Sequence, residues 1–286
     1  MAKAVLRTRN AHQSKIVKLL NGMTGRYSLW EIWQDFVMMA AVSISNVLNN
    51  PHQTEREAMY KRCVSKYSAQ EINVFAELLA EVAQSMEDDP DQDFLGELFM
   101  ALELGNNWAG QFFTPYSVCR GMSAITLDTN IKERIAKQGW VSVNDPACGA
   151  GALLIAYANE CKSVGVNFQT SVLFVAQDID LVAGLMCYIQ LSLMGCPGYV
   201  VIQNTLTKPS TSYDPRGLLP HDNPNVWYTP FYNSPVWQGR RLAAQMDLLL
   251  KNLTPLPKEK SKEDTIEIPI ENDIKITEAP SQLELF

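Results

Sequence analysis

The sequence predicts an α/β fold in which a parallel sheet follows an all-helical N-terminal domain. Apolar residues recur at helical spacing up to about residue 105, and short apolar strands alternate with helices after that point. Hydrophobic residues make up 47% of the 286-residue chain, which is enough for a core and excludes a wholly disordered protein. We therefore expect a helical domain at 1–105, an α/β domain at 106–253 and a disordered acidic tail at 254–286.

The N-terminal domain begins with a basic segment and continues as amphipathic helices. Residues 1–26 carry six basic and no acidic side chains, which is typical of a solvated helix and arm and is also compatible with a phosphate-contacting face. Ser28 with Glu31, and Ser68 with Glu71, form the capping-box pattern that begins a helix. The stretch DQDFLGELFMALEL is a further amphipathic segment, and the helical spacing of apolar residues ends after it.

Three strands of the α/β domain are expected within WVSVNDPACGAG (140–151), SVLFVAQDID (171–180) and GYVVIQNTL (198–206). The segments between them read as helices, and short apolar strands joined through helices imply right-handed crossovers and a parallel sheet. NVWYTPFY (225–232) is expected as a fourth strand, followed by a helix at 240–253.

Composition restricts the class of protein. The chain has 24 basic and 31 acidic side chains, a balance that argues against coating nucleic acid by bulk charge but leaves a local basic patch open. Its six cysteines form no C-x-x-C pair and its three histidines are far apart, so no metal site is expected and a reducing compartment fits. With no apolar leader and no bilayer-length apolar stretch, we expect a cytoplasmic protein without membrane contact.

A ligand-binding turn is expected between the end of the first strand and the start of the helix that follows it. Asp145 is followed there by Gly149 and Gly151, which let the backbone turn sharply and approach a ligand closely. Neither the third glycine of a dinucleotide motif nor the lysine of a phosphate-binding loop is present. A carboxylate in their place suggests a cationic group in the ligand, although glycine-rich turns between strands and helices are common without any ligand.

The next two strands also end in polar residues. Asp178 follows the second strand and suits ribose hydroxyls, whereas Asp180 is expected to cap the following helix. Asn204 follows the third strand, where its side chain can read an adenine edge. Because the carboxyl ends of parallel strands meet at one edge of the sheet, these residues together predict a nucleotide-type pocket.

The order GQFFTP (110–115), DPACGAG (145–151), AQDID (176–180) and QNTLT (203–207) resembles adenine-N6 DNA methyltransferases. It looks most like the modification subunits of type I restriction systems, over about residues 90–207. The resemblance implies a Rossmann-like methyltransferase sheet, S-adenosylmethionine as cofactor and DNA as partner. It also implies a cofactor site made of Phe113, Thr114, Asp145, Ala147, Gly149, Gly151, Asp178, Ile179 and Asn204.

By the same resemblance, Thr114 and its neighbours hold the methionine carboxylate end, and Asp145 faces the methionine ammonium group. Asp178 takes the ribose hydroxyls and Ile179 packs on the adenine face. Asn204 accepts from the adenine amino group, at a position where the family usually has an acid.

The motif that binds the target base, (Asn or Asp)-Pro-Pro-(Phe or Tyr), is incomplete. Its nearest matches are YTPF (228–231) and NSPV (233–236), so the catalytic candidates are Tyr228, Pro230, Phe231 and Asn233. The flipped adenine is then expected near Asn233 and Phe231. Two alternatives stay open: an aromatic-rich core strand at this point, and a catalytically degenerate homologue that acts as a DNA-associated or cofactor-sensing interaction module.

The chain is also short for the family, which predicts a truncated sheet completed by a partner chain or by self-association. Its last five residues, Gln282, Leu283, Glu284, Leu285 and Phe286, resemble the Gln-Leu-x-Leu-Phe peptide with which bacterial proteins bind the sliding clamp. A polar tether ending in a short apolar anchor is typical of peptides that dock in a groove, and the alternative is a tail folded on its own domain. Gln282, Leu283, Leu285 and Phe286 are therefore the expected clamp-binding residues.

Overall fold

The computed structural model describes residues 10–47, 51–104, 113–221 and 223–253. Two compact units divide the chain, Met1–Met246 and Asp247–Phe286, and the description below concerns the first of them. The predicted boundary near residue 105 and the predicted tail at 254–286 lie outside the described residues. None of the described helices combines the length and the apolar character needed to cross a membrane.

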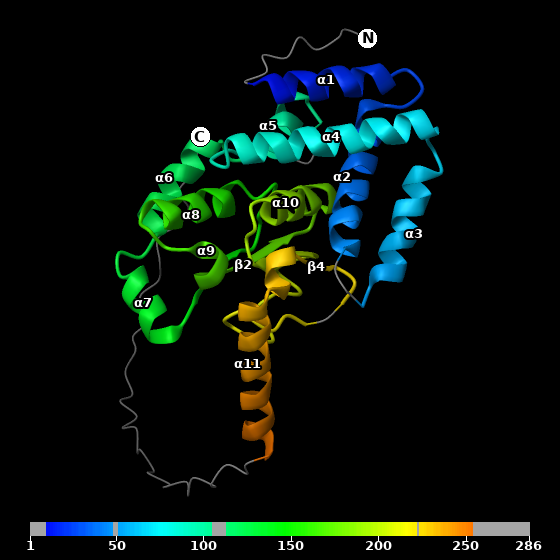
Figure 1. Ribbon diagram of the computed structural model, residues 1–286. Coiled ribbons are helices and arrows are strands. Elements are labelled where there is room, and N and C mark those ends of the chain that lie inside the picture. Colours follow the sequence, from blue (N-terminus) through cyan, green and yellow to red (C-terminus); the bar gives the residue numbers. More distant parts are fainter. Residues whose placement is uncertain (1–9, 48–50, 105–112, 222, 254–286) are drawn as a thin grey trace, which may run out of the picture. The chain divides into compact units, whose positions relative to one another are not determined.

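Seven helices precede the sheet in the described part of the chain (Figure 1): α1 (Ala11–Met23), α2 (Leu29–Asn46), α3 (Gln53–Val64), α4 (Ala69–Asp88), α5 (Phe94–Ala101), α6 (Tyr116–Thr126) and α7 (Ile131–Gln138). Both predicted capping boxes are present. Ser28 begins α2 and Ser68 begins α4, each accepting from the backbone amide three residues on while the glutamate there bonds back.

The sheet has the order β1-β2-β3-β4, with β1 (Val141–Asp145), β2 (Val172–Asp178), β3 (Gly198–Ile202) and β4 (Val226–Tyr228). The first three strands are parallel, as predicted, which confirms the α/β class. Their crossovers run through α8 (Ala152–Ser163), α9 (Phe168–Ser171) and α10 (Leu181–Leu193). The fourth strand differs, because it lies antiparallel to β3.

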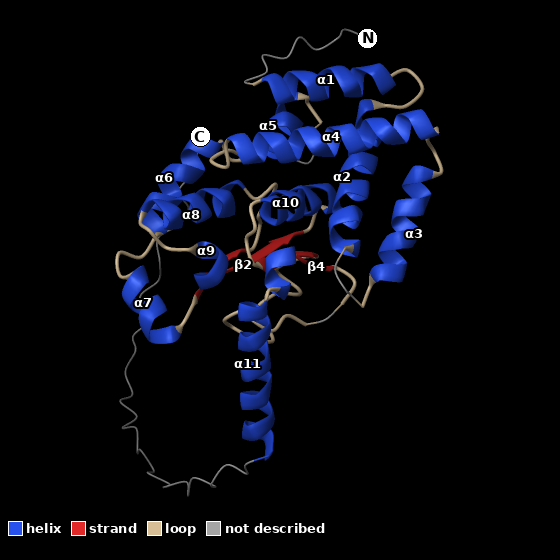
Figure 2. Cartoon of the chain, in the orientation of Figure 1, coloured by secondary structure: helices blue, strands red, loops and turns tan. Residues whose placement is uncertain are grey.

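Alternate side chains of β2 face two separate cores. Phe174 and Ala176 pack in the larger core, whose other side chains come from α8, α10 and the helices before the sheet. Figure 2 shows α10 between the sheet and α4. Leu173 and Val175 face the second core, which also contains Trp237 at the start of α11 (Pro235–Leu253). Between β4 and α11, the short helix η1 (Pro230–Asn233) closes this second core.

A buried arginine joins the first helices to the last strand. Arg56 of α3 is 2% exposed, and its guanidinium carbon lies 4.1 Å from the centroid of the Trp227 ring. The same side chain donates hydrogen bonds to the Ser45 hydroxyl and to the Val226 carbonyl oxygen. Since a buried charge without partners is costly, these contacts hold α2, α3 and β4 in one arrangement.

Candidate cofactor site

A cavity of about 180 Å³ lies beside the carboxyl end of β1. The structure brings five of the predicted cofactor residues together in its wall: Phe113, Thr114, Asp145, Ala147 and Gly149. Residues 110–112 of the GQFFTP motif lie outside the described residues.

The turn after β1 is joined to the end of β2 by hydrogen bonds. Asp145 Oδ1 accepts from the Ala147 amide at 3.1 Å, and the Gly149 amide donates to Asp178 Oδ2 at 2.8 Å. The Cys148 amide donates to the Gln177 carbonyl oxygen at 3.0 Å. These three hydrogen bonds hold the turn against the ends of both strands.

Gly149 requires the absence of a side chain. Its φ is +53°, and a Cβ there would lie 3.0 Å from Cδ1 of the Phe113 ring. Gly151 has φ +98° and begins α8, where a Cβ would lie 2.9 Å from Cys187 Sγ. Gly151 thus allows α8 and α10 to pack closely and does not line the cavity.

Asp178 and Ile179 lie at the end of β2. Asp178 Oδ1 accepts from the Asp180 amide at 2.9 Å, so both carboxylate oxygens hold backbone amides and keep further acceptor positions. The Ile179 side chain is 69% exposed, which leaves it free to pack on a flat ring. Asp180 caps α10 by accepting from the Ala183 amide at 2.8 Å, which confirms the capping prediction.

Asn204 lies beyond the end of β3 and is exposed. Its Oδ1 accepts from the amides of Leu206 (2.9 Å) and Thr207 (3.3 Å), so the oxygen expected to read adenine already closes a turn. Thr205 Oγ1 donates to the Pro146 carbonyl oxygen at 2.6 Å and thereby holds this loop against the turn after β1.

A second cavity, of about 590 Å³, adjoins the first and shares Asp93, Phe113 and Thr114 with it. Asp93 is a site residue that the sequence analysis missed. It is 2% exposed and caps α5 by accepting from the Gly96 amide. Burial raises the pKa of Asp93 to about 6, although hydrogen bonds from Gln190 and Gly96 oppose the shift.

Negative charge accumulates at this edge of the sheet. Burial raises the pKa of Asp145, and the nearby charge of Asp178 adds to the increase. Burial, followed by the charges of Asp93 and Asp145, raises the pKa of the Cys119 thiol to about 11. The described residues contain no group of three or more histidine, cysteine or acidic side chains arranged to hold a metal ion. Asp145 and Asp178 lie close enough for the charge of one to raise the pKa of the other, and such concentrated negative charge favours a cationic group in the ligand.

The four catalytic candidates lie at the opposite edge of the sheet. Tyr228 pairs with Tyr199 at the start of β3, because β4 runs antiparallel. The Phe231 ring lies over Gly195, which precedes β3. A five-residue strand rises about 16 Å, so a strand length separates these residues from the turn after β1.

Their contacts are those of core and loop residues. The rings of Tyr228 and Tyr232 are stacked at 5.1 Å, and Asn233 Oδ1 accepts from Arg241 at 3.3 Å. Pro230 begins η1. The structure therefore does not bring Tyr228, Pro230, Phe231 or Asn233 to the predicted cofactor residues.

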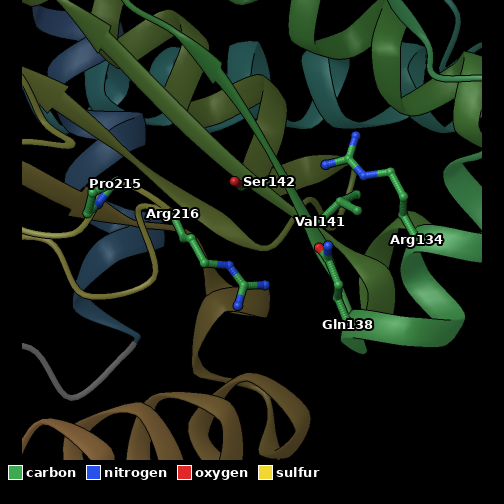
Figure 3. A pocket seen from close by; sticks show the side chains of 6 residues that line it. All are labelled: Arg134, Gln138, Val141, Ser142, Pro215 and Arg216. Atoms are coloured by element: carbon green, nitrogen blue, oxygen red, sulfur yellow. The ribbon is translucent and has the colours of Figure 1, made fainter. Parts of the chain in front are cut away.

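The free side of β1 lines a further cavity, of about 460 Å³ (Figure 3). β1 is the first strand of the sheet and pairs with β2 alone among the described strands. The cavity runs between Arg134 and Gln138 of α7 and the loop residues Pro215 and Arg216, with exposed Ser142 at its wall.

The model of a known protein family, the N-6 DNA methylases, matches residues 97–266, more than half of the chain. The chain belongs to the N-6 DNA methylase family. Members of this family transfer a methyl group from S-adenosylmethionine, so the cofactor predicted from the sequence is confirmed. No curated protein sequence matches the chain.

One solved structure similar to this N-6 DNA methylase family member comes from Listeria monocytogenes and is assigned to the class I S-adenosylmethionine-dependent methyltransferases. The two chains are 16% identical, with a TM-score of 0.35, over 69% of this chain and 55% of that one. This chain thus spans about half the length of the solved structure that it matches.

Proposed function

We propose that this chain is an S-adenosylmethionine-dependent, DNA adenine-N6 methyltransferase-like protein that supplies the cofactor-binding part of the reaction. One observation carries the proposal: the turn after β1 is hydrogen-bonded to Asp178, and Phe113 and Thr114 line the same cavity as that turn. The order of the four motifs, similar to that of type I modification subunits, supports DNA as the substrate.

The side chains at this edge fit the groups of the cofactor. Asp145 offers a half-buried carboxylate to the ammonium group, and Asp178 offers free acceptor positions to ribose hydroxyls. Ile179 offers an exposed apolar face to the adenine ring. When bound, the cofactor supplies a methyl group on a sulfonium centre, which a nucleophilic amino nitrogen can accept.

The acceptor side of the reaction needs groups that lie near this cavity. Phe231 and Asn233 lie a strand length away from it, so we propose that a second polypeptide positions the target adenine. The same placement favours a second candidate function, a degenerate methyltransferase that binds the cofactor without turnover and acts as an interaction module.

Calorimetry with S-adenosylmethionine and transfer of labelled methyl groups to mixed-sequence DNA test these proposals together. We expect the full chain to bind the cofactor and to transfer no label on its own. Absence of cofactor binding would contradict the proposed function. Transfer by the chain alone that is lost in Asn233→Ala would contradict the need for a second polypeptide and restore the catalytic role of that residue.

The free side of β1 is the proposed place for the second polypeptide. An unpaired strand edge is a template for an added strand, and Ser142 and Asn144 are exposed along it. Arg134 and Arg216 flank the cavity there, and Arg134 is already paired with Asp128 at 2.9 Å, so we propose an added strand that offers an acidic side chain to Arg216. Pairing with β1 of a second copy would bring the two Arg216 side chains close together, which like-charge repulsion disfavours.

We therefore expect the isolated full-length chain to be monomeric. Sedimentation velocity over micromolar concentrations measures this directly. A fraction of dimer that grows with protein concentration, and that is larger in Arg216→Glu than in the wild type, would contradict this expectation. It would indicate that a second copy of the chain, and not a different protein, pairs with β1.

One of the two lysines on the first described helix is already paired with acidic side chains, and the other, Lys18, is exposed. Lys15 lies 2.8 Å from Glu77 and 2.6 Å from Glu81, which raises the pKa of this lysine to about 12. Three more basic residues of the segment, Lys3, Arg7 and Arg9, lie outside the described residues. We propose recruitment through a partner as the main route of this chain to DNA.

We also propose that the C-terminal pentapeptide recruits the chain to DNA through the bacterial sliding clamp. Gln282, Leu283, Leu285 and Phe286 lie outside the described residues, and the proposal rests on their match to the clamp-binding pattern. Tethering to a clamp raises the effective concentration of the protein at DNA to about the millimolar range.

Deletion of residues 282–286 is expected to abolish co-elution with purified sliding clamp in size-exclusion chromatography. The substitution Glu284→Ala is the matched control, because the pattern leaves that position free, and it should keep clamp binding unchanged. Equal co-elution of the deleted and full-length chains would refute recruitment by this peptide.

A further inference from the structure

The cavity of about 590 Å³ between α5 and α6 is lined by the carboxylate of Asp93, to which the proposed function assigns no ligand contact. Asp91, Asp93 and Glu97 line it together with one cation, Arg120. Arg120 Nε lies 3.4 Å from Asp91, so its charge is already paired. Asp93 differs from the other two acids because it is 98% buried and lines both this cavity and the smaller one beside β1.

Among the described residues, hydrogen bonds reach only one oxygen of Asp93. Oδ1 accepts from the Gly96 amide at 3.1 Å and from Gln190 Nε2 at 2.8 Å. Oδ2 forms no hydrogen bond with any residue that the structure describes. Asp93 keeps its 2% exposure where it lines the two cavities, so Oδ2 can accept a hydrogen bond from a ligand there.

Gln190 fixes this carboxylate relative to the turn after β1. Its Nε2 also donates to the Ala150 carbonyl oxygen at 2.8 Å, and its Oε1 accepts from the Leu95 amide at 3.0 Å. A single buried amide therefore connects α5, α10 and the turn that carries Gly149. The position of Asp93 is thus set by the same elements that build the cofactor site.

Asp93 and Asp145 act on a common region. The charges of both raise the pKa of the Cys119 thiol, which itself lines the smaller cavity. Two carboxylates that converge from α5 and β1 favour one compact cation with several N–H donors between them.

We propose that Asp93 is a second cofactor-binding carboxylate, whose Oδ2 accepts from the α-ammonium group of the amino acid half of S-adenosylmethionine. This inference rests on the proposed function, since it assigns one further contact within the same site. It places the amino acid half toward α5 and α6, and the nucleoside half toward Asp178 and Ile179.

Calorimetry on Asp93→Asn with two ligands tests this assignment. Asparagine retains an oxygen for Gly96 and Gln190 but removes the charge. We expect the dissociation constant for S-adenosylmethionine to rise about tenfold or more, which is at least 1.4 kcal/mol. Binding of 5′-methylthioadenosine, which has the nucleoside but no amino acid half, should stay unchanged.

The control Asp35→Asn removes another buried carboxylate, one that bonds Lys66 and Tyr67, and should leave both affinities unchanged. Unchanged affinity of Asp93→Asn for S-adenosylmethionine, or an equal loss for both ligands, would overturn the assignment. If Asp93→Asn is misfolded and binds neither ligand, Asp93→Ser is used in its place. Serine keeps an oxygen that can cap α5, and the expected result is the same. A wild-type chain that binds neither ligand would instead refute the proposed function.

Discussion

Replacing Gly149 with valine is expected to abolish cofactor binding while the rest of the fold stays in place. A β-branched residue is a strong outlier at φ +53°, and its Cβ would lie 3.0 Å from the Phe113 ring. The turn must then move, which breaks the hydrogen bond from its amide to Asp178. We expect affinity for S-adenosylmethionine to fall by about a hundredfold or more, roughly 3 kcal/mol, in calorimetry.

Gly121→Ala is the matched control. Gly121 lies within α6, close in sequence to the cavity residues Cys119 and Met122, and a Cβ there meets nothing within 4 Å. This variant should bind the cofactor as the wild type does and should be about 0.5–1 kcal/mol more stable. Retention of full affinity by Gly149→Val would show that the turn does not form the site.

Replacing Gly198 with alanine is expected to produce the largest loss of stability. Its Cβ would lie 1.8 Å from the Phe174 carbonyl oxygen, an atom of the neighbouring strand backbone that cannot rotate away. The β2–β3 pairing must separate locally, and the Thr229 hydroxyl, which accepts from the Gly198 amide at 3.0 Å, loses its position. We expect the free energy of unfolding to fall by about 3 kcal/mol.

Urea denaturation followed by circular dichroism measures this change. Gly239→Ala in α11 provides the comparison, because a Cβ at Gly239 also meets nothing within 4 Å. That variant is expected to gain about 0.5–1 kcal/mol. Equal unfolding midpoints for Gly198→Ala and the wild type would mean that β2 and β3 do not approach as closely as described.

The parallel core of the sheet was predictable because its signals are local. Residues 140–163 show a short apolar strand, a glycine-containing turn and a helix in succession, and the next strand ends in Asp178. The carboxyl ends of parallel strands share one edge, so the clustering of Asp145, Gly149 and Asp178 followed from topology alone.

The direction of β4 was not predicted, although the sequence contains a signal for it. A parallel connection needs a crossover, usually a helix. The segment between Ile202 and Val226 contains four prolines and forms no helix among its described residues. It returns to the edge from which it left, where the Ile202 amide donates to the Asn225 carbonyl oxygen at 3.0 Å. The chain can then only run back antiparallel, which carries Phe231 and Asn233 to the other edge.

Asp93 was missed for a different reason. Three residues before Gly96, it reads in sequence as an ordinary helix cap, and that reading is correct for Oδ1. Its burial and its place beside the turn arise from packing of α5 against α10, which no local pattern encodes. The burial of a polar group by distant elements is a tertiary effect, and only the assembled structure reveals it.

The contact between Arg56 and β4 determines which shortened versions of this protein can be studied. A fragment that starts at residue 106 would leave the Val226 carbonyl oxygen without its arginine donor and would expose the Trp227 ring, which is 3% exposed in the intact chain. A fragment that ends at residue 105 would keep a guanidinium group that no longer has a ring to stack on. Genetic complementation with two separately expressed halves would therefore require both halves to be present while each is folding.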